Sequence, residues 1–142
     1  MRLPEHIRGE IVAHALAVHP EEACGLLAVD APGCVRRAYC LPNVDRSPIA
    51  FTVDPDGHFA SLTDAESNGW ALGGSFHSHP RTAAVPSRTD IAGALEPGWV
   101  HLIVGLTDPG APELRAWTIQ DGAAAEVLLE AVAEGSGAVA CP

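Results

Sequence analysis

Apolar residues recur at helical spacing near the N-terminus, at positions Leu3, Ile7, Ile11, Ala15 and Val18. This pattern predicts an amphipathic helix from Pro4 to Val18, and Pro20 ends it. Two apolar runs follow, Cys24 to Val29 and Val35 to Leu41, with a turn sequence between them. Such a pair of runs predicts a β-hairpin.

The middle of the chain predicts a strand, a helix and another strand. The first strand is expected from Ile49 to Val53. Asp54-Pro55 then combines an N-cap residue with a proline at the first helical position, which indicates a helix to about Ser67. Trp70 to His77 is apolar and β-rich and is expected to be a strand, although its glycines weaken it.

The last third begins with Ser87-Arg88-Thr89-Asp90, a helix N-cap followed three positions later by an acid, before Ile91 to Leu95. Trp99 to Leu106 and Glu113 to Ile119 are then predicted to be strands, with the sheet ending at the second. The Ala- and Leu-rich stretch from Ala123 to Ala133 is predicted to be a helix, and residues 135–142 a flexible tail.

Helices and strands alternate without a domain-length linker or an internal repeat. We therefore expect one α/β domain over residues 1–134, with a single mixed β-sheet flanked by helices. The order of the strands cannot be read from the sequence.

Composition supports a folded domain and excludes one class of function. The chain has 142 residues, of which 47% are hydrophobic and 18% charged, so one core can form. The formal charge is -10, and all eight basic residues are arginines. A field of this sign repels phosphate backbones, so we expect no nucleic-acid partner; Arg36-Arg37 is too short a basic stripe.

The sequence also bears on location. No apolar run approaches the ~20 residues that a membrane span needs, so we expect no membrane association and a cytoplasmic protein. The four cysteines, Cys24, Cys34, Cys40 and Cys141, form no CxxC pair. We therefore expect reduced thiols and neither a structural zinc knuckle nor a thioredoxin-like motif.

Candidate chemistry gathers between residues 77 and 90. Residues two apart on a strand share a face, so His77 and His79 can offer imidazole nitrogens to one metal ion while Ser78 points away. Asp90, in the first turn of the next helix, can add an oxygen ligand if the Pro-rich loop folds back. Three protein ligands leave one position open, which favours a hydrolytic metal site over a structural one.

A hydrolytic metal site also needs a group that moves protons. Glu22 is the candidate, because it lies where the first helix meets the Cys24 strand. Glu21 stands beside it, but adjacent strand residues face opposite ways, so only one of the two can reach the metal.

The spacing of these residues resembles that of the JAMM, or MPN-plus, metallopeptidases: an upstream Glu, then His-Ser-His-Pro, a loop, and Ser-x-x-Asp. The segment Glu22-Ala-Cys-Gly-Leu-Leu27 looks like the family's Glu segment and selects Glu22 over Glu21. The likeness extends to Ile119. It implies the MPN/JAB fold, with its cytidine-deaminase-like architecture.

The resemblance further implies a set of roles. His77, His79 and Asp90 would bind Zn²⁺, Glu22 would act as general acid/base, and Ser87 would donate to the oxyanion. The compact form of the motifs is most similar to bacterial members that process sulfur carriers. The implied substrate is a small ubiquitin-like sulfur-carrier protein ending in Gly-Gly, cut after the last glycine to release cysteine.

Several residues keep a second interpretation. Ser87 can be a plain helix N-cap as well as an oxyanion donor. Cys24 can lie near the metal, but a small buried hydrophobe is the simpler interpretation. The remaining histidines, His101 among them, are interpreted as surface or core residues.

Alternative functions are an isopeptidase that removes ubiquitin-like modifiers from lysine and a non-catalytic MPN-type scaffold. The short segment from Ile91 to Trp99 leaves little room for the insertions of chain-specific deubiquitinating enzymes. A scaffold would not need the complete ligand set. The related RadC-like proteins are disfavoured by charge, and zinc deaminases by the missing cysteine pair. The oligomeric state is left open.

Overall fold

The computed structural model describes residues 1–133, which form three helices and eight strands. The helices are α1 (Glu5–Val18), α2 (Pro55–Ser67) and α3 (Arg88–Gly93). The strands are β1 (Arg2–Pro4), β2 (Cys24–Val29), β3 (Val35–Leu41), β4 (Ala71–His79), β5 (Val100–Gly105), β6 (Glu113–Gln120), β7 (Ala123–Val127) and β8 (Glu130–Val132). The predicted tail at residues 135–142 lies outside the described residues.

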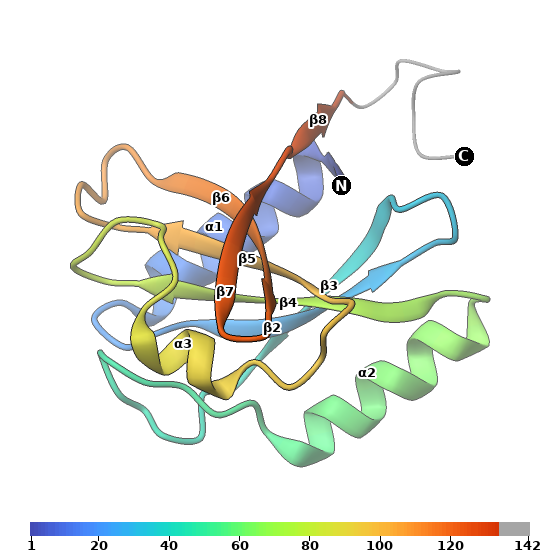
Figure 1. Ribbon diagram of the computed structural model, residues 1–142, viewed down its shortest axis with the longest axis horizontal. Coiled ribbons are helices and arrows are strands. Elements are labelled where there is room, and N and C mark those ends of the chain that lie inside the picture. The colour runs from blue at the N-terminus through green and yellow to red at the C-terminus, as the bar shows by residue number, and fades with distance from the viewer. Residues whose placement is uncertain (134–142) are drawn as a thin grey trace.

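Six strands form one mixed sheet in the order β3-β2-β4-β5-β6-β7, which confirms the predicted α/β class. Only β4 and β5 are parallel; every other neighbouring pair is antiparallel. β1 and β8 form a separate parallel pair. β4 is therefore a central strand (Figure 1), and the predicted metal ligands His77 and His79 belong to its carboxyl end.

Helices cover the sheet on both faces, as predicted. α1 packs its apolar stripe, including Ile7 and Ile11, on the face to which Phe76 points. α2 and α3 lie on the opposite face (Figure 1), where α2 packs against β4 and β2 and residues of both helices line a cavity over the sheet. β4 thus presents alternate residues to two different environments.

Two predicted elements are wrong. The segment from Ile49 to Val53 is a loop with one isolated bridge, Asn43 to Val53. Ala123 to Ala133 is not a helix but contains β7 and β8, so the sheet does not end at β6. The helix propensity of its alanines favours a helix over Ala123 to Ala133. However, Asp121 and Gly122 both have positive φ, which suits a tight hairpin that pairs β7 with β6.

The structure also bears on membrane spans and on the state of the cysteines. Within residues 1–133, no helix is long and apolar enough to cross a membrane. Cys24 and Cys40 are free thiols, but Cys34 is disulfide-bonded, so the expectation of reduced thiols is wrong for that residue.

Candidate metal centre

Three predicted ligands meet at one point. Asp90 Oδ2 lies 3.1 Å from Nε2 of His77 and 3.0 Å from Nε2 of His79. The two Nε2 atoms are themselves 3.1 Å apart. Both rings are buried, with His77 only 3% exposed. The Pro-rich loop therefore folds back as the spacing predicted, and α3 delivers Asp90 to the end of β4.

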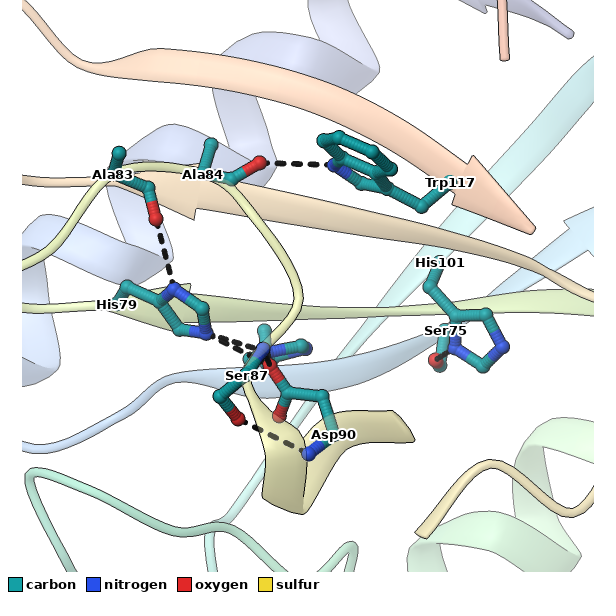
Figure 2. A network of polar contacts seen from close by, with 9 residues as sticks. Ser75, His79, Ala83, Ala84, Ser87, Asp90, His101 and Trp117 are labelled. Atoms are coloured by element: carbon teal, nitrogen blue, oxygen red, sulfur yellow. Dashed lines mark hydrogen bonds and ion pairs between the residues drawn. The ribbon is translucent and has the colours of Figure 1, made fainter. Parts of the chain in front are cut away.

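The proton on His79 shows why this cluster suits a cation. Nδ1 of His79 lies 2.9 Å from the Ala83 carbonyl oxygen, which can only accept, so Nδ1 carries a proton (Figure 2). Nε2 can therefore donate to the Asp90 carboxylate only when the ring is protonated; in the neutral ring it is an acceptor that faces another acceptor. A divalent cation between them would satisfy both atoms and Nε2 of His77 together. These residues therefore fit a metal with nitrogen and oxygen ligands.

The pKa values of the cluster follow from the same contacts. The pKa of His77 is lowered, because the effect of burial is larger than the opposing effect of its hydrogen bond to Asp90. For His79, burial also lowers the pKa, but hydrogen bonds to Asp90 and to the Ala83 carbonyl outweigh it, and the pKa rises. Burial alone would raise the pKa of Asp90, but hydrogen bonds from both histidines keep it well below its usual range.

Glu22 lies beside this cluster with an unusual environment for a carboxylate. It is 5% exposed, and its buried Oε2 has no hydrogen-bond partner among the described residues. Burial raises the pKa of Glu22 to about 7; the charge of His79 opposes this rise and that of Asp90 adds to it. The structure therefore brings Glu22 within electrostatic reach of two predicted ligands. Its catalytic role stays a prediction.

Ser87 forms a capping box with Asp90 at the start of α3. Its Oγ accepts from the Asp90 N–H (3.0 Å), and its own N–H donates to Asp90 Oδ2 (2.8 Å; Figure 2). The N-cap interpretation is thus confirmed. The same bonds orient the Asp90 carboxylate toward the histidines, so the cap and the cluster form one local structure.

The loop that joins β4 to α3 is fixed by β6. Ala84 is fully buried; its carbonyl accepts from Trp117 Nε1 (2.9 Å; Figure 2), and its N–H donates to Glu113 Oε1 (3.3 Å). Gly105 packs against it so closely that a Cβ there would lie 2.8 Å from the Ala84 nitrogen. These contacts hold the neighbouring Ala83 carbonyl, which in turn orients His79.

A cavity of about 560 Å³ opens beside His77 and Asp90. The sheet forms its floor with Leu26, Ser75, His101 and Ile119, while the loop at Phe51 and the segment from Gly93 to Trp99 form its walls. Phe51 stacks on His77 with ring centroids 4.6 Å apart. The cavity is largely apolar and leads to the predicted metal ligands.

Sequence reasoning missed one residue of this cavity. The sequence predicts an ordinary surface or core histidine at His101, but the parallel register pairs it with Ser75, and its Nδ1 lies 3.1 Å from Ser75 Oγ (Figure 2). Burial lowers the pKa of His101, so the ring is neutral near pH 7. Only the strand order, which the sequence does not give, could have placed it here.

Cys24 is adjacent to the cluster in register, opposite His77, but it is fully buried. Its thiol lies within hydrogen-bonding distance of the Leu41 and Pro42 carbonyl oxygens. Burial, followed by the charge of Glu22, raises its pKa to about 12. These facts support the simpler interpretation of Cys24 as a small buried residue.

Fold and site together define a metallopeptidase of the JAMM type. Residues 4–120 match the family of prokaryotic homologs of the JAB domain, and the chain belongs to that family. It is 37% identical to the CysO-cysteine peptidase of Mycobacterium tuberculosis, over 82% of this chain and 80% of that protein. It is 35% identical to a desampylase of Haloferax volcanii, over 83% and 88%.

A solved structure shows the same fold. The solution structure of a Desulfitobacterium hafniense protein superimposes with a TM-score of 0.85 at 36% identity, covering 94% of this chain and 93% of that one. The prediction of an MPN/JAB fold and of membership in this metallopeptidase family is therefore confirmed.

Proposed function

We propose that this protein is a zinc peptidase that hydrolyses the amide bond after the C-terminal Gly-Gly of a ubiquitin-like sulfur carrier, releasing cysteine from a carrier-cysteine adduct. The observation that carries the proposal is the convergence of His77, His79 and Asp90 on one point beside the buried, unpaired carboxylate of Glu22. The names of the relatives, a CysO-cysteine peptidase and a desampylase, support the choice of substrate class.

His77, His79 and Asp90 would hold the zinc ion, two through Nε2 and one through Oδ2. When bound, zinc supplies a Lewis acid that polarises a carbonyl and makes water nucleophilic near neutral pH. The chain supplies the rest of the chemistry. The His79 tautomer is fixed by Ala83, and the Asp90 oxygen is oriented by the Ser87 N–H.

Glu22 is the group we assign to proton transfer. Its unpaired Oε2 can accept a proton from the attacking water and then deliver it to the leaving amine. Burial raises its pKa to about 7, which suits a group that must both take and give a proton at neutral pH. A nearby bound cation would lower this value and favour the base form.

Ser87 can serve two purposes. Its Oγ accepts from the Asp90 N–H, which leaves the hydroxyl proton available for another acceptor. We assign that proton to the developing oxyanion of the scissile carbonyl. Helix capping and oxyanion stabilisation then use different parts of one hydroxyl group.

The apolar cavity beside His77 is the proposed site for the carrier tail. An extended Gly-Gly tail is narrow, and its missing side chains would let the scissile carbonyl approach the ligands. The floor of the cavity also carries the polar side chains of Ser75 and His101, which can contact the tail main chain. The cavity therefore combines apolar walls with a few polar groups.

The experiment compares two substrates with the zinc-loaded protein. One is a ubiquitin-like carrier ending in Gly-Gly and joined to cysteine; the other is the same carrier joined to a lysine side chain. Mass spectrometry should show a single cut after the last glycine of the cysteine adduct. Scattered cleavage, or none after Gly-Gly, would rule out the proposal.

The lysine-linked substrate tests the alternative function, an isopeptidase for ubiquitin-like modifiers, which the desampylase relative favours. Preferential cleavage of that substrate would move the assignment to the alternative. A non-catalytic scaffold is disfavoured because it would not need His77, His79 and Asp90 to converge near a buried Glu22. A cytoplasmic location stays a prediction.

A further inference from the structure

Ser78 stands between the two histidine ligands, yet its side chain lies on the opposite face of β4 and is 0% exposed. Its contacts lead to the other half of the site. The Ser78 N–H donates to the Ala23 carbonyl oxygen (3.0 Å), and Ser78 Oγ accepts from the Ala23 N–H (2.8 Å). Ser78 therefore forms two hydrogen bonds with Ala23, the residue that follows Glu22.

The second of these bonds departs from an ordinary strand ladder. In an antiparallel pair that exchanges two hydrogen bonds, the Ala23 N–H would donate to the Ser78 main-chain carbonyl. Here it donates to the side-chain oxygen instead. The chain leaves the ladder at this point, and β2 begins only at Cys24. Glu22 is thus placed by a side chain rather than by regular sheet pairing.

Asn43 holds the other end of the same peptide unit. The amide that joins Glu22 to Ala23 has its N–H bonded to Ser78 Oγ and its C=O bonded to Asn43 Nδ2 (3.1 Å). The preceding peptide is fixed as well, since the Glu22 N–H donates to the Ser47 carbonyl oxygen (2.8 Å). Both peptides that flank the Glu22 Cα are therefore held, which fixes the direction of its side chain.

Asn43 is itself held rigidly. Its Nδ2 also donates to the Ala50 carbonyl oxygen (3.0 Å), and its Oδ1 accepts from the N–H groups of Asp45 (3.0 Å) and Thr52 (3.1 Å). All four hydrogen-bonding positions of the amide are in use. The loop that includes Phe51, which lines the cavity, is thereby tied to the Glu22 main chain.

We propose that Ser78 and Asn43 are positioning residues that clamp the Glu22–Ala23 peptide and so aim the Glu22 carboxylate at the reacting atoms. Glu22 Oε2 has no hydrogen-bond partner among the described residues, so the side chain depends on its main chain for direction. β4 thus carries His77 and His79 on one face, while Ser78 on its other face sets the position of Glu22. This inference rests on the proposed role of Glu22.

The test removes the Ser78 hydroxyl and measures several quantities with the carrier-cysteine adduct. Ser78→Ala should lower kcat about 10–100-fold, because a small misplacement of a catalytic group is costly. KM and the zinc content should stay within about twofold of the unmodified protein. Ser78→Thr, which keeps a hydroxyl, should recover most of the lost kcat.

A matched control separates positioning from general destabilisation. Ser61 is also buried, and its Oγ donates to the Gly57 carbonyl oxygen (2.7 Å) within α2. Ser61→Ala removes one buried serine hydrogen bond away from Glu22, so kcat should change less than twofold. Equal kcat losses in the two serine variants would contradict the inference.

A double-mutant cycle with Glu22→Gln decides the mechanism of the effect. If Ser78 acts through Glu22, Ser78→Ala should cause little further loss in single-turnover rate once Glu22 is Gln. A full further 10–100-fold loss would overturn the inference, as would an unchanged kcat in Ser78→Ala. Full activity of Glu22→Gln alone would instead refute the proposed role of Glu22, which distinguishes the two failures.

Discussion

The two faces of β4 carry neighbouring residues into opposite environments. Phe76 is 1% exposed and packs among apolar side chains from α1 and β2. One residue later, His77 is equally buried but meets Asp90 and His79. Burial of Phe76 stabilises the fold, whereas burial of ionisable groups costs free energy unless they are paired. The same strand therefore supports stability on one face and chemistry on the other.

The apolar face shows how tightly the strands pack. A Cβ at Gly25 would lie 2.3 Å from the Phe76 ring, so only glycine leaves space for it. Buried polar atoms without hydrogen-bond partners are more frequent on the polar face: among the described residues they are Glu22 Oε2, His77 Nδ1 and His101 Nε2 there, against His14 Nε2 beside Phe76. A functional site on a rigid support is expected to concentrate unsatisfied polar groups on its own face and close packing on the other.

The largest expected effect lies on the polar face. Glu22→Gln removes the proton-transfer group while keeping its size, so kcat should fall about 10²–10⁴-fold with zinc content unchanged. Glu21→Gln is the control and should change kcat less than twofold. Steady-state kinetics with the carrier-cysteine adduct measures both. Equal losses would show that the wrong carboxylate has been assigned.

On the apolar face, Phe76→Ala should reduce stability rather than chemistry. Loss of a buried phenylalanine costs about 3–5 kcal/mol of unfolding free energy. Urea denaturation measures this cost, and protein that stays folded should keep its zinc. A change below 1 kcal/mol would mean that the two faces do not differ as described.

The β6 contacts to the loop after β4 should matter for the metal. Trp117→Phe removes the N–H that donates to the Ala84 carbonyl and so loosens the segment that orients His79. Zinc affinity should fall about 10–100-fold, the range found when outer-shell partners of metal ligands are changed. Competition with a chelator measures it. Trp70→Phe, at a tryptophan that contacts Arg36 and Arg37 instead, should leave the affinity unchanged.

The smallest effect concerns pH and stability of the metal-free protein. Burial raises the pKa of Glu22 from 4.5 to about 7, so its contribution to stability is fully present below pH 4.5 and is lost as pH rises through 7. Glu22→Gln avoids that loss. Relative to the unmodified protein, the variant should gain about 1–3 kcal/mol between pH 4.5 and pH 8. Urea denaturation measures the unfolding free energies of both proteins. A difference between them that does not change with pH would contradict the buried environment assigned to Glu22.

Local patterns predicted that the candidate ligands would lie together. The two-residue spacing of His77 and His79 and the capping sequence at Ser87 are short-range signals, and the structure brings these residues and Asp90 together. The choice of Glu22 over Glu21 needed the family resemblance, because position on the chain alone left both open.

The features that could not be predicted from the sequence all depend on contacts between distant segments. β7 forms because the Asp121-Gly122 turn returns the chain along β6, and this pairing overrides the helix propensity of its alanines. His101 lies in the cavity only because β5 pairs with β4 in a particular register. Asn43 reaches Glu22 across 21 positions of sequence. A single sequence does not encode these registers in any local pattern.

Zinc content tests the central claim most directly. The protein should be purified without chelator and analysed by inductively coupled plasma mass spectrometry, together with His77→Ala and Asp90→Ala. The account predicts close to one zinc per chain in the unmodified protein and a large loss in both variants, because each removes one of three converging ligand atoms. Absence of zinc from the unmodified protein, with no activity after zinc is added, would contradict it.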